Sequence, residues 1–147
     1  MSHPLTDALQ TAPDQPARSG AWTLEADGAE VNPIGMKADA LRLRRDAPTA
    51  QPAPELAQRL AKRATYLLEP LRVVESEPER AHLRSDDPHA EGPTRDFYDV
   101  WVTPDELSVE RLRAEPGQPR QKRPLHLTWE QAERLARDAE RIYGEGE

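Results

Sequence analysis

The positions of the prolines constrain the fold of this chain more than any other feature of its sequence. The 147 residues include 15 prolines, which cut the chain into short pieces and spare two helix-patterned stretches, residues 55–69 and 125–147. Long helices elsewhere are disfavoured, because proline lacks a backbone donor and clashes with the preceding turn. Several strand-like runs lie between these two stretches, so the order from Pro54 onward is helix, strands, helix.

Composition divides the chain into three parts. Of Leu, Ile, Val and Phe, residues 1–20 contain only Leu5 and Leu9. Such a segment buries too little to offset its ordering entropy, so we expect a disordered tail. We assign residues 21–53 to an N-terminal hairpin followed by a proline-rich linker, and residues 54–144 to an α+β domain.

The hairpin is predicted from a turn signal. Asp27-Gly28 separates two short alternating runs, residues 22–25 and 29–31, and Asp-Gly between alternating runs is a strong hairpin signal. Asn-Pro-Ile-Gly at residues 32–35 marks a second turn. Residues 36–45 fit a helix or a strand equally well.

The two helices have clear local signals. In residues 55–69 an apolar stripe that includes Leu68 recurs at helical spacing, and Pro70 forbids continuation. The last helix has a capping box, in which Thr128 at the N-cap faces Gln131 three residues later.

The strands of the predicted domain are short. The fold class that follows is α+β, a small antiparallel sheet of three to four strands flanked by two helices, with the N-terminal hairpin and disordered tail. The expected strands are residues 71–76, 80–85, 97–103 and 107–114, with a short run at 125–127.

Aromatic side chains provide the candidate interaction surface. Phe97 and Trp101 alternate with other apolar residues on one strand, which is therefore apolar on both faces. If helices cover one face, the other exposes an aromatic patch, unless the hairpin carrying Trp22 folds over it. We take Phe97, Trp101 and Trp22 as the interaction surface, because exposed apolar patches of this kind mark interfaces.

A basic block gives an alternative function. Arg120, Lys122 and Arg123 lie in a loop at residues 119–124, and helix–three strands–helix is the element order of the double-stranded RNA-binding domain. The net charge of −7 argues against nucleic acid, since such binders present a basic face to the phosphate backbone.

A second alternative is a small hydrolase that uses carboxylate and histidine loop residues. His82, Asp86, Asp87 and His89 are the weak metal candidates, but their spacing matches no established metal signature, so we predict no metal. The chain has no cysteine, no nucleophile elbow and no cluster of glycines. We assign no catalytic residue and no cofactor, and the balance is against an enzyme.

The remaining inferences concern cellular setting and partners. No apolar run approaches the length of a membrane span, and the N-terminus lacks signal-peptide character, so a cytoplasmic protein is expected. The basic charge is carried by 17 Arg and 3 Lys, a bias that a GC-rich bacterial genome explains. The function that we expect is a small acidic, non-catalytic interaction or structural module that binds a partner protein or forms a homodimer.

Overall fold

The structure is a computed structural model that describes residues 2–85 and 92–144. Within these ranges the chain forms three helices and eleven strands. They are α1 (Pro4–Thr11), β1 (Ala17–Ser19), β2 (Trp22–Asp27), β3 (Glu30–Val31), β4 (Gly35–Ala38), β5 (Ala40–Arg45), α2 (Ala53–Arg63), β6 (Leu71–Glu77), β7 (Arg80–Ser85), β8 (Arg95–Val102), β9 (Glu106–Ala114), β10 (Gln121–Arg123), β11 (Leu125–Thr128) and α3 (Trp129–Gly144).

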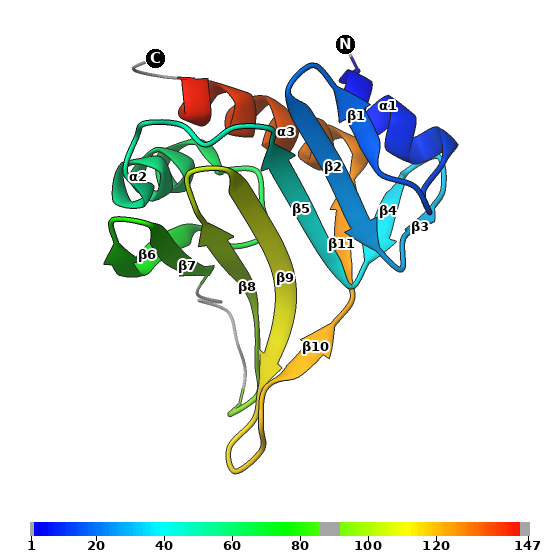
Figure 1. Ribbon diagram of the computed structural model, residues 1–147. Coiled ribbons are helices and arrows are strands. Elements are labelled where there is room, and N and C mark those ends of the chain that lie inside the picture. Colours follow the sequence, from blue (N-terminus) through cyan, green and yellow to red (C-terminus); the bar gives the residue numbers. More distant parts are fainter. Residues whose placement is uncertain (1, 86–91, 145–147) are drawn as a thin grey trace.

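The strands form two antiparallel sheets (Figure 1). The large sheet has eight strands in the order β1-β2-β5-β9-β8-β7-β6, and β10 pairs with the second half of β9. The small sheet has the order β11-β4-β3. The β8–β9 hairpin is the longest pairing, with eight residues of each strand in register.

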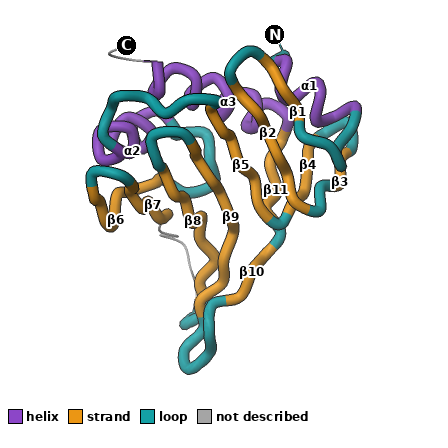
Figure 2. Tube along the Cα trace, in the orientation of Figure 1, coloured by secondary structure: helices purple, strands orange, loops and turns teal. Residues whose placement is uncertain are grey.

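The core lies between the large sheet and the elements behind it. The three helices gather at one end of the molecule, behind the large sheet (Figures 1 and 2). Alternate residues of the central strands point toward them, as the two-residue period of a strand requires. The buried cluster joins both sheets and all three helices; it includes Leu9, Leu24, Met36, Leu43, Leu60, Val100, Leu107, Leu127, Leu135 and Ile142.

The start of α3 confirms the predicted capping box. The Gln131 backbone N–H donates to Thr128 Oγ1 at 3.1 Å, and the Thr128 N–H donates to Gln131 Oε1 at 2.9 Å. The helix predicted over residues 55–69 is present but shorter, because α2 ends at Arg63 and the following residues form a loop. Both helices therefore begin close to where local sequence signals place them.

The predicted small sheet of three to four strands is wrong. Strand β5 lies between β2 and β9, and this single placement joins the N-terminal strands to the strands of the predicted domain. Leu41 and Leu43 of β5 point to the core beside Val109 and Leu107 of β9. Residues 17–45 and 71–123 thus share one sheet and one core, covered by three helices.

The hairpin predicted across Asp27-Gly28 is also wrong. Gly28 has the positive φ of +59° that such a turn uses. The strands on either side do not pair with each other, however, since β2 pairs with β5 and β3 pairs with β4. The turn directs the chain from the large sheet into the small one.

The expected disordered tail is ordered in the described residues from Ser2 onward. Helix α1 begins after His3, whose Nδ1 accepts a hydrogen bond from the Leu5 N–H at 3.1 Å. Leu5 and Leu9 are both fully buried, at 0% exposure. Helix α1, which carries these two leucines one turn apart, packs against β1, β2 and α3. No helix in the described ranges is long and apolar enough to cross a membrane.

Candidate functional site

A groove of about 520 Å³ opens over the small sheet. Its walls are the turn before β4, the start of α3 and the loop between α2 and β6. Two of its lining residues, Ile34 and Leu68, are 78% and 74% exposed, and among the described residues they are the exposed large hydrophobic side chains. The remaining lining residues are Glu30, Val31, Asn32, Gly35, Met36, Lys37, His126, Leu127, Thr128 and Gln131.

The turn that carries Ile34 is fixed by hydrogen bonds on both sides. Asn32 Oδ1 accepts from the backbone N–H groups of Ile34 at 2.8 Å and Gly35 at 3.0 Å. The indole N–H of Trp129 donates to the Asn32 carbonyl at 2.7 Å, and the Trp129 backbone N–H donates to the Ile34 carbonyl at 3.2 Å. These hydrogen bonds fix the backbone of the turn, from which the Ile34 side chain extends into solvent.

The loop that carries Leu68 is anchored in the same way. The Gln131 side-chain amide donates to the Tyr66 carbonyl at 3.0 Å, so the capping residue of α3 also ties down this loop. On the other side of Leu68, Arg111 forms a bidentate ion pair with Glu69 at 2.7 and 3.1 Å. Leu68 is the exposed residue between these two attachments.

The side chain of Tyr66 adds a third attachment to this loop. Its hydroxyl donates to Asp138 Oδ2 of α3 at 2.8 Å. Burial, together with the neighbouring Asp138 carboxylate, raises the pKa of Tyr66 well above its ordinary value. The phenol is therefore protonated at neutral pH and can act as the donor to Asp138.

Gly35 shapes the floor of the groove. A Cβ atom at this position would lie 2.4 Å from the carbonyl oxygen of Leu127 and 3.1 Å from Thr128 Cα, so β4 approaches β11 more closely than a side chain permits.

Most polar side chains that line the groove are already paired within the protein, and Asn32, Thr128 and Gln131 form the hydrogen bonds given above. Lys37 pairs with Glu30 at 3.0 Å, so the charges at its edge balance each other. Across the strands, His126 lies opposite Lys37 and has no carboxylate opposite it in the register of the small sheet. The groove can accept apolar side chains, and its residues do not form an acid–base pair.

The predicted aromatic residues do not share one exposed surface. Trp22 is 8% exposed and packs edge-on against Tyr143 of α3, with ring centroids 5.2 Å apart. The Tyr143 hydroxyl donates to the carbonyls of Thr103 and Glu106 at 2.7 and 2.8 Å. Trp22 therefore belongs to the core between β2 and α3.

Phe97 and Trp101 lie on the opposite, outer face of the large sheet. Phe97 is only 5% exposed, because the guanidinium groups of Arg84 and Arg120 lie over its ring at 5.0 and 5.3 Å. Trp101 is half-buried between the stacked His82 ring at 4.1 Å and the Arg80 guanidinium at 4.8 Å. Cationic and histidine side chains cover the second apolar face; the N-terminal strands extend the sheet sideways instead.

The basic loop does not form one free cationic patch. Arg120 packs over Phe97, as described above, and Lys122 pairs with Glu110 at 3.6 Å. Arg123 lies in β10 opposite Arg111 of β9. The three cations therefore face different surroundings.

Of the metal candidates, only His82 lies in the described residues. It is 6% exposed and its Nε2 lies 2.5 Å from Asp99 Oδ1. Asp86, Asp87 and His89 fall outside the described ranges. Within residues 2–85 and 92–144, no group of three or more His, Asp or Glu side chains could hold a metal ion.

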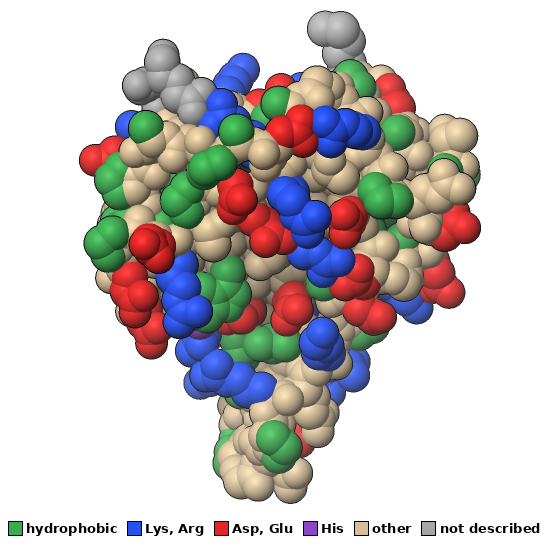
Figure 3. Space-filling view, viewed as in Figure 1, with side chains coloured by type: hydrophobic (Ala, Val, Ile, Leu, Met, Phe, Trp, Pro, Cys, Tyr) green, Lys and Arg blue, Asp and Glu red, His purple; other side chains and the backbone are tan. Residues whose placement is uncertain are grey.

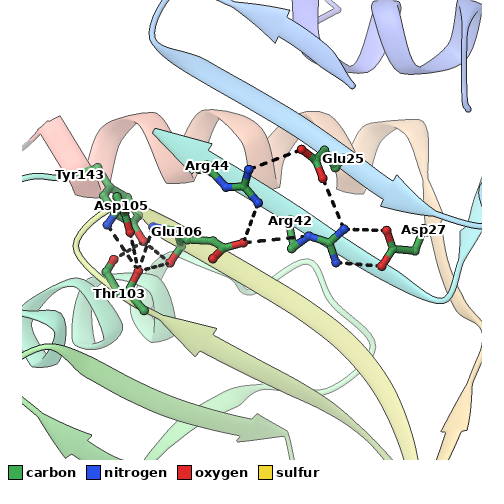
Figure 4. A network of polar contacts seen from close by, with 8 residues as sticks. All are labelled: Glu25, Asp27, Arg42, Arg44, Thr103, Asp105, Glu106 and Tyr143. Carbon is green, nitrogen blue, oxygen red and sulfur yellow. Dashed lines mark hydrogen bonds and ion pairs between the residues drawn. The ribbon is translucent and has the colours of Figure 1, made fainter. Parts of the chain in front are cut away.

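The rest of the outer face is a mosaic of paired charges. Figure 3 shows acidic and basic side chains interleaved over this face. Arg42 of β5 pairs with Asp27 and Glu25 of β2 and with Glu106 of β9, and Arg44 joins the same network (Figure 4). The Arg42 guanidinium lowers the pKa of the Asp27 carboxyl, which keeps this pairing ionised at neutral pH.

No protein-family model, curated protein or solved structure matches this chain. Sequence reasoning missed Ile34 and Leu68, which were read as a turn residue and a helix-stripe residue. The available signal was a large aliphatic side chain in the Asn-Pro-Ile-Gly turn, where a polar residue is the norm.

Proposed function

We propose that this protein is a non-catalytic interaction module that binds an apolar peptide segment of a partner protein in the groove between Ile34 and Leu68. The observation that carries the proposal is the 78% and 74% exposure of these side chains on segments fixed by hydrogen bonds. Exposed aliphatic groups on a rigid backbone lose little freedom on binding, so more of their burial energy is available for affinity.

The size of the groove fits a peptide segment. Its volume of about 520 Å³ lies in the range of ligand-sized pockets. Burying one Leu or Ile side chain contributes about 1.5–3 kcal/mol, so two such contacts support a weak, reversible complex once association entropy is subtracted. Because the edge charges of Lys37 and Glu30 pair with each other, the preferred segment carries large apolar side chains and little charge.

A peptide suits the groove better than a second copy of the chain. A stable dimer buries about 800 Å² on each partner around a largely apolar centre. In the described residues the exposed large hydrophobic side chains number two, and the outer face of the large sheet is charged. The apolar area is enough for a few side chains of a partner and too small for a dimer face.

Selection from a random peptide library against the immobilised full chain tests this proposal. Enriched sequences should contain two or more large apolar residues close together, and their binding should fall at least about tenfold in the Ile34→Ser/Leu68→Ser variant, which removes two hydrophobic contacts. Val74→Ser is the matched control, since Val74 is a partly exposed apolar residue in β6, away from the groove.

Two results would contradict the proposal. One is a set of peptides that bind the wild-type and Ile34→Ser/Leu68→Ser chains equally. The other is sedimentation of the wild-type chain as a dimer that the same two substitutions dissociate, which would assign the groove to self-association.

A further inference from the structure

A second pocket, of about 310 Å³, lies beside Phe97 on the outer face of the large sheet and is rich in arginine. It is formed where β6, β7, β8, the end of β9 and the residue before β10 come together. Four arginines line it, with few other charged groups among its lining residues. These residues are Arg72, Arg84, Ser85, Arg95, Asp96, Phe97, Ala114 and Arg120.

The arginines are held in place by the sheet. Arg72 and Arg84 are cross-strand partners in the β6–β7 pair, which brings their Cα atoms to adjacent positions. Arg84 and Arg120 both pack over the Phe97 ring, as described for the outer face. Guanidinium groups stacked on a ring keep their N–H edges available for a ligand. Arg95, at the start of β8, is exposed beside them.

Among the described residues, the carboxylates in and beside the pocket already have partners. Both oxygens of Asp96 accept from Arg113, at 2.8 and 3.1 Å. Asp99 Oδ1 contacts His82 at 2.5 Å and forms an ion pair with Arg84, at 3.8 Å from Nε, without a hydrogen bond to it. Arg84 Nε is buried and lacks a hydrogen-bond partner in the described part of the chain. A buried donor of this kind is costly unless a ligand satisfies it.

We propose that this pocket binds the phosphoryl groups of a small anion. Arginine forks match the oxygens of phosphate bidentately, and several of them together neutralise more than one negative charge. The volume exceeds that of a single phosphate and suits a diphosphate. General electrostatic attraction does not account for such a site, since the chain has a net charge of −7. The proposal is independent of the peptide groove, with which the pocket shares no lining residue.

Calorimetric titration of the full chain with pyrophosphate at fixed ionic strength tests the site. We expect saturable binding with one site per chain. Arg95→Gln and Arg120→Gln should each weaken it by about tenfold or more, as expected for loss of a charge-assisted hydrogen bond. Because Arg95 is exposed, its replacement leaves packing intact. Parallel titration with ADP distinguishes a nucleotide, which binds more tightly than pyrophosphate, from a free diphosphate, for which the two affinities are equal.

Lys122→Gln is the control, because it removes the same charge from a nearby residue that is outside the pocket and paired with Glu110. It should change the affinity by less than about twofold, since the charge of Lys122 is exposed to solvent, screened by salt and paired with Glu110. Asp86→Asn/Asp87→Asn is titrated as well, because these carboxylates directly follow Ser85 in the sequence. Absence of saturable binding in both the wild-type chain and this variant overturns the proposal. Equal weakening by Lys122→Gln and Arg95→Gln also overturns it.

Discussion

The outer face of the large sheet and the groove over the small sheet differ in how far their large apolar side chains are exposed to solvent. On the outer face, Phe97 is 5% exposed beneath two arginines. In the groove, Ile34 and Leu68 remain 78% and 74% exposed although the chain has 17 arginines. Arginine side chains thus cover the apolar ring on the outer face, whereas they leave the aliphatic side chains of the groove exposed.

The difference separates side chains that stabilise the fold from side chains that are available for binding. Burial of the Phe97 ring stabilises the folded state. The exposed side chains of Ile34 and Leu68 add little to folding stability, and their burial energy is gained when a partner binds. Around the groove, hydrogen bonds to Asn32 and Tyr66 fix the backbone and leave the aliphatic groups uncovered. Substitutions at Phe97, Gly35, Asp96, Ile34 and Leu68 can break or sharpen this comparison.

Phe97→Ala should destabilise the fold most, by about 3–5 kcal/mol, because the ring is buried under two guanidinium groups and its loss leaves a cavity. Chemical denaturation measures the loss. A change below about 1 kcal/mol would show that the arginine cover is loose and that the ring is in effect a surface group.

Gly35→Ala should cost about 1–3 kcal/mol, because the added methyl group meets the Leu127 carbonyl oxygen at 2.4 Å and forces β4 away from β11. Gly144→Ala is the matched control, since nothing lies within 4 Å of a Cβ there. Thermal melts of the two variants compare them. Equal melting temperatures would mean that the groove floor is not closely packed.

Asp96→Asn should cost about 1 kcal/mol or less near neutral pH, since its ion pair with Arg113 is partly exposed. Arg113 lowers the pKa of Asp96 below its ordinary 3.8. The ionised form therefore stabilises the fold above that value, and this contribution is lost as pH falls through the lowered pKa. Urea unfolding at neutral and acid pH should show the difference between variant and wild type disappearing in acid. A difference that grows in acid contradicts the pairing.

Ile34→Ser and Leu68→Ser should have the smallest effect, within about 0.5 kcal/mol of the wild type, because exposed side chains add little to stability. Differential scanning calorimetry provides the comparison with Phe97→Ala. A loss above about 2 kcal/mol in either serine variant would assign that residue to the folded core and remove the contrast between the two regions.

Local features of the fold could be predicted from the sequence. The start of α3 is fixed by hydrogen bonds between Thr128 and Gln131, which are only three positions apart. Helix α2 begins beside Pro54, as expected. The pairing of β5 with β9 could not be predicted, because it joins residues more than sixty positions apart. Asp27-Gly28 has the expected turn backbone, but the sequence does not determine which strands its flanks join.

The sites depended on the same long-range information. Phe97 and Trp101 were chosen for the apolar character of their strand, and their cover of arginine and histidine comes from β7 and from the residue before β10. Ile34 and Leu68 stand 34 positions apart and line the same groove only because Trp129 and Gln131 of α3 anchor both segments. A pattern within one segment cannot reveal either arrangement.

The most direct measurement uses the two isoleucines of the chain, Ile34 in the groove and Ile142 in α3 at 0% exposure. Isotope labelling of isoleucine methyl groups gives one signal for each by NMR. On titration with a peptide selected for binding, the account predicts that the Ile34 methyl signal shifts saturably while the Ile142 signal stays in place. An unchanged Ile34 signal at full binding, or equal shifts of both signals, would contradict it.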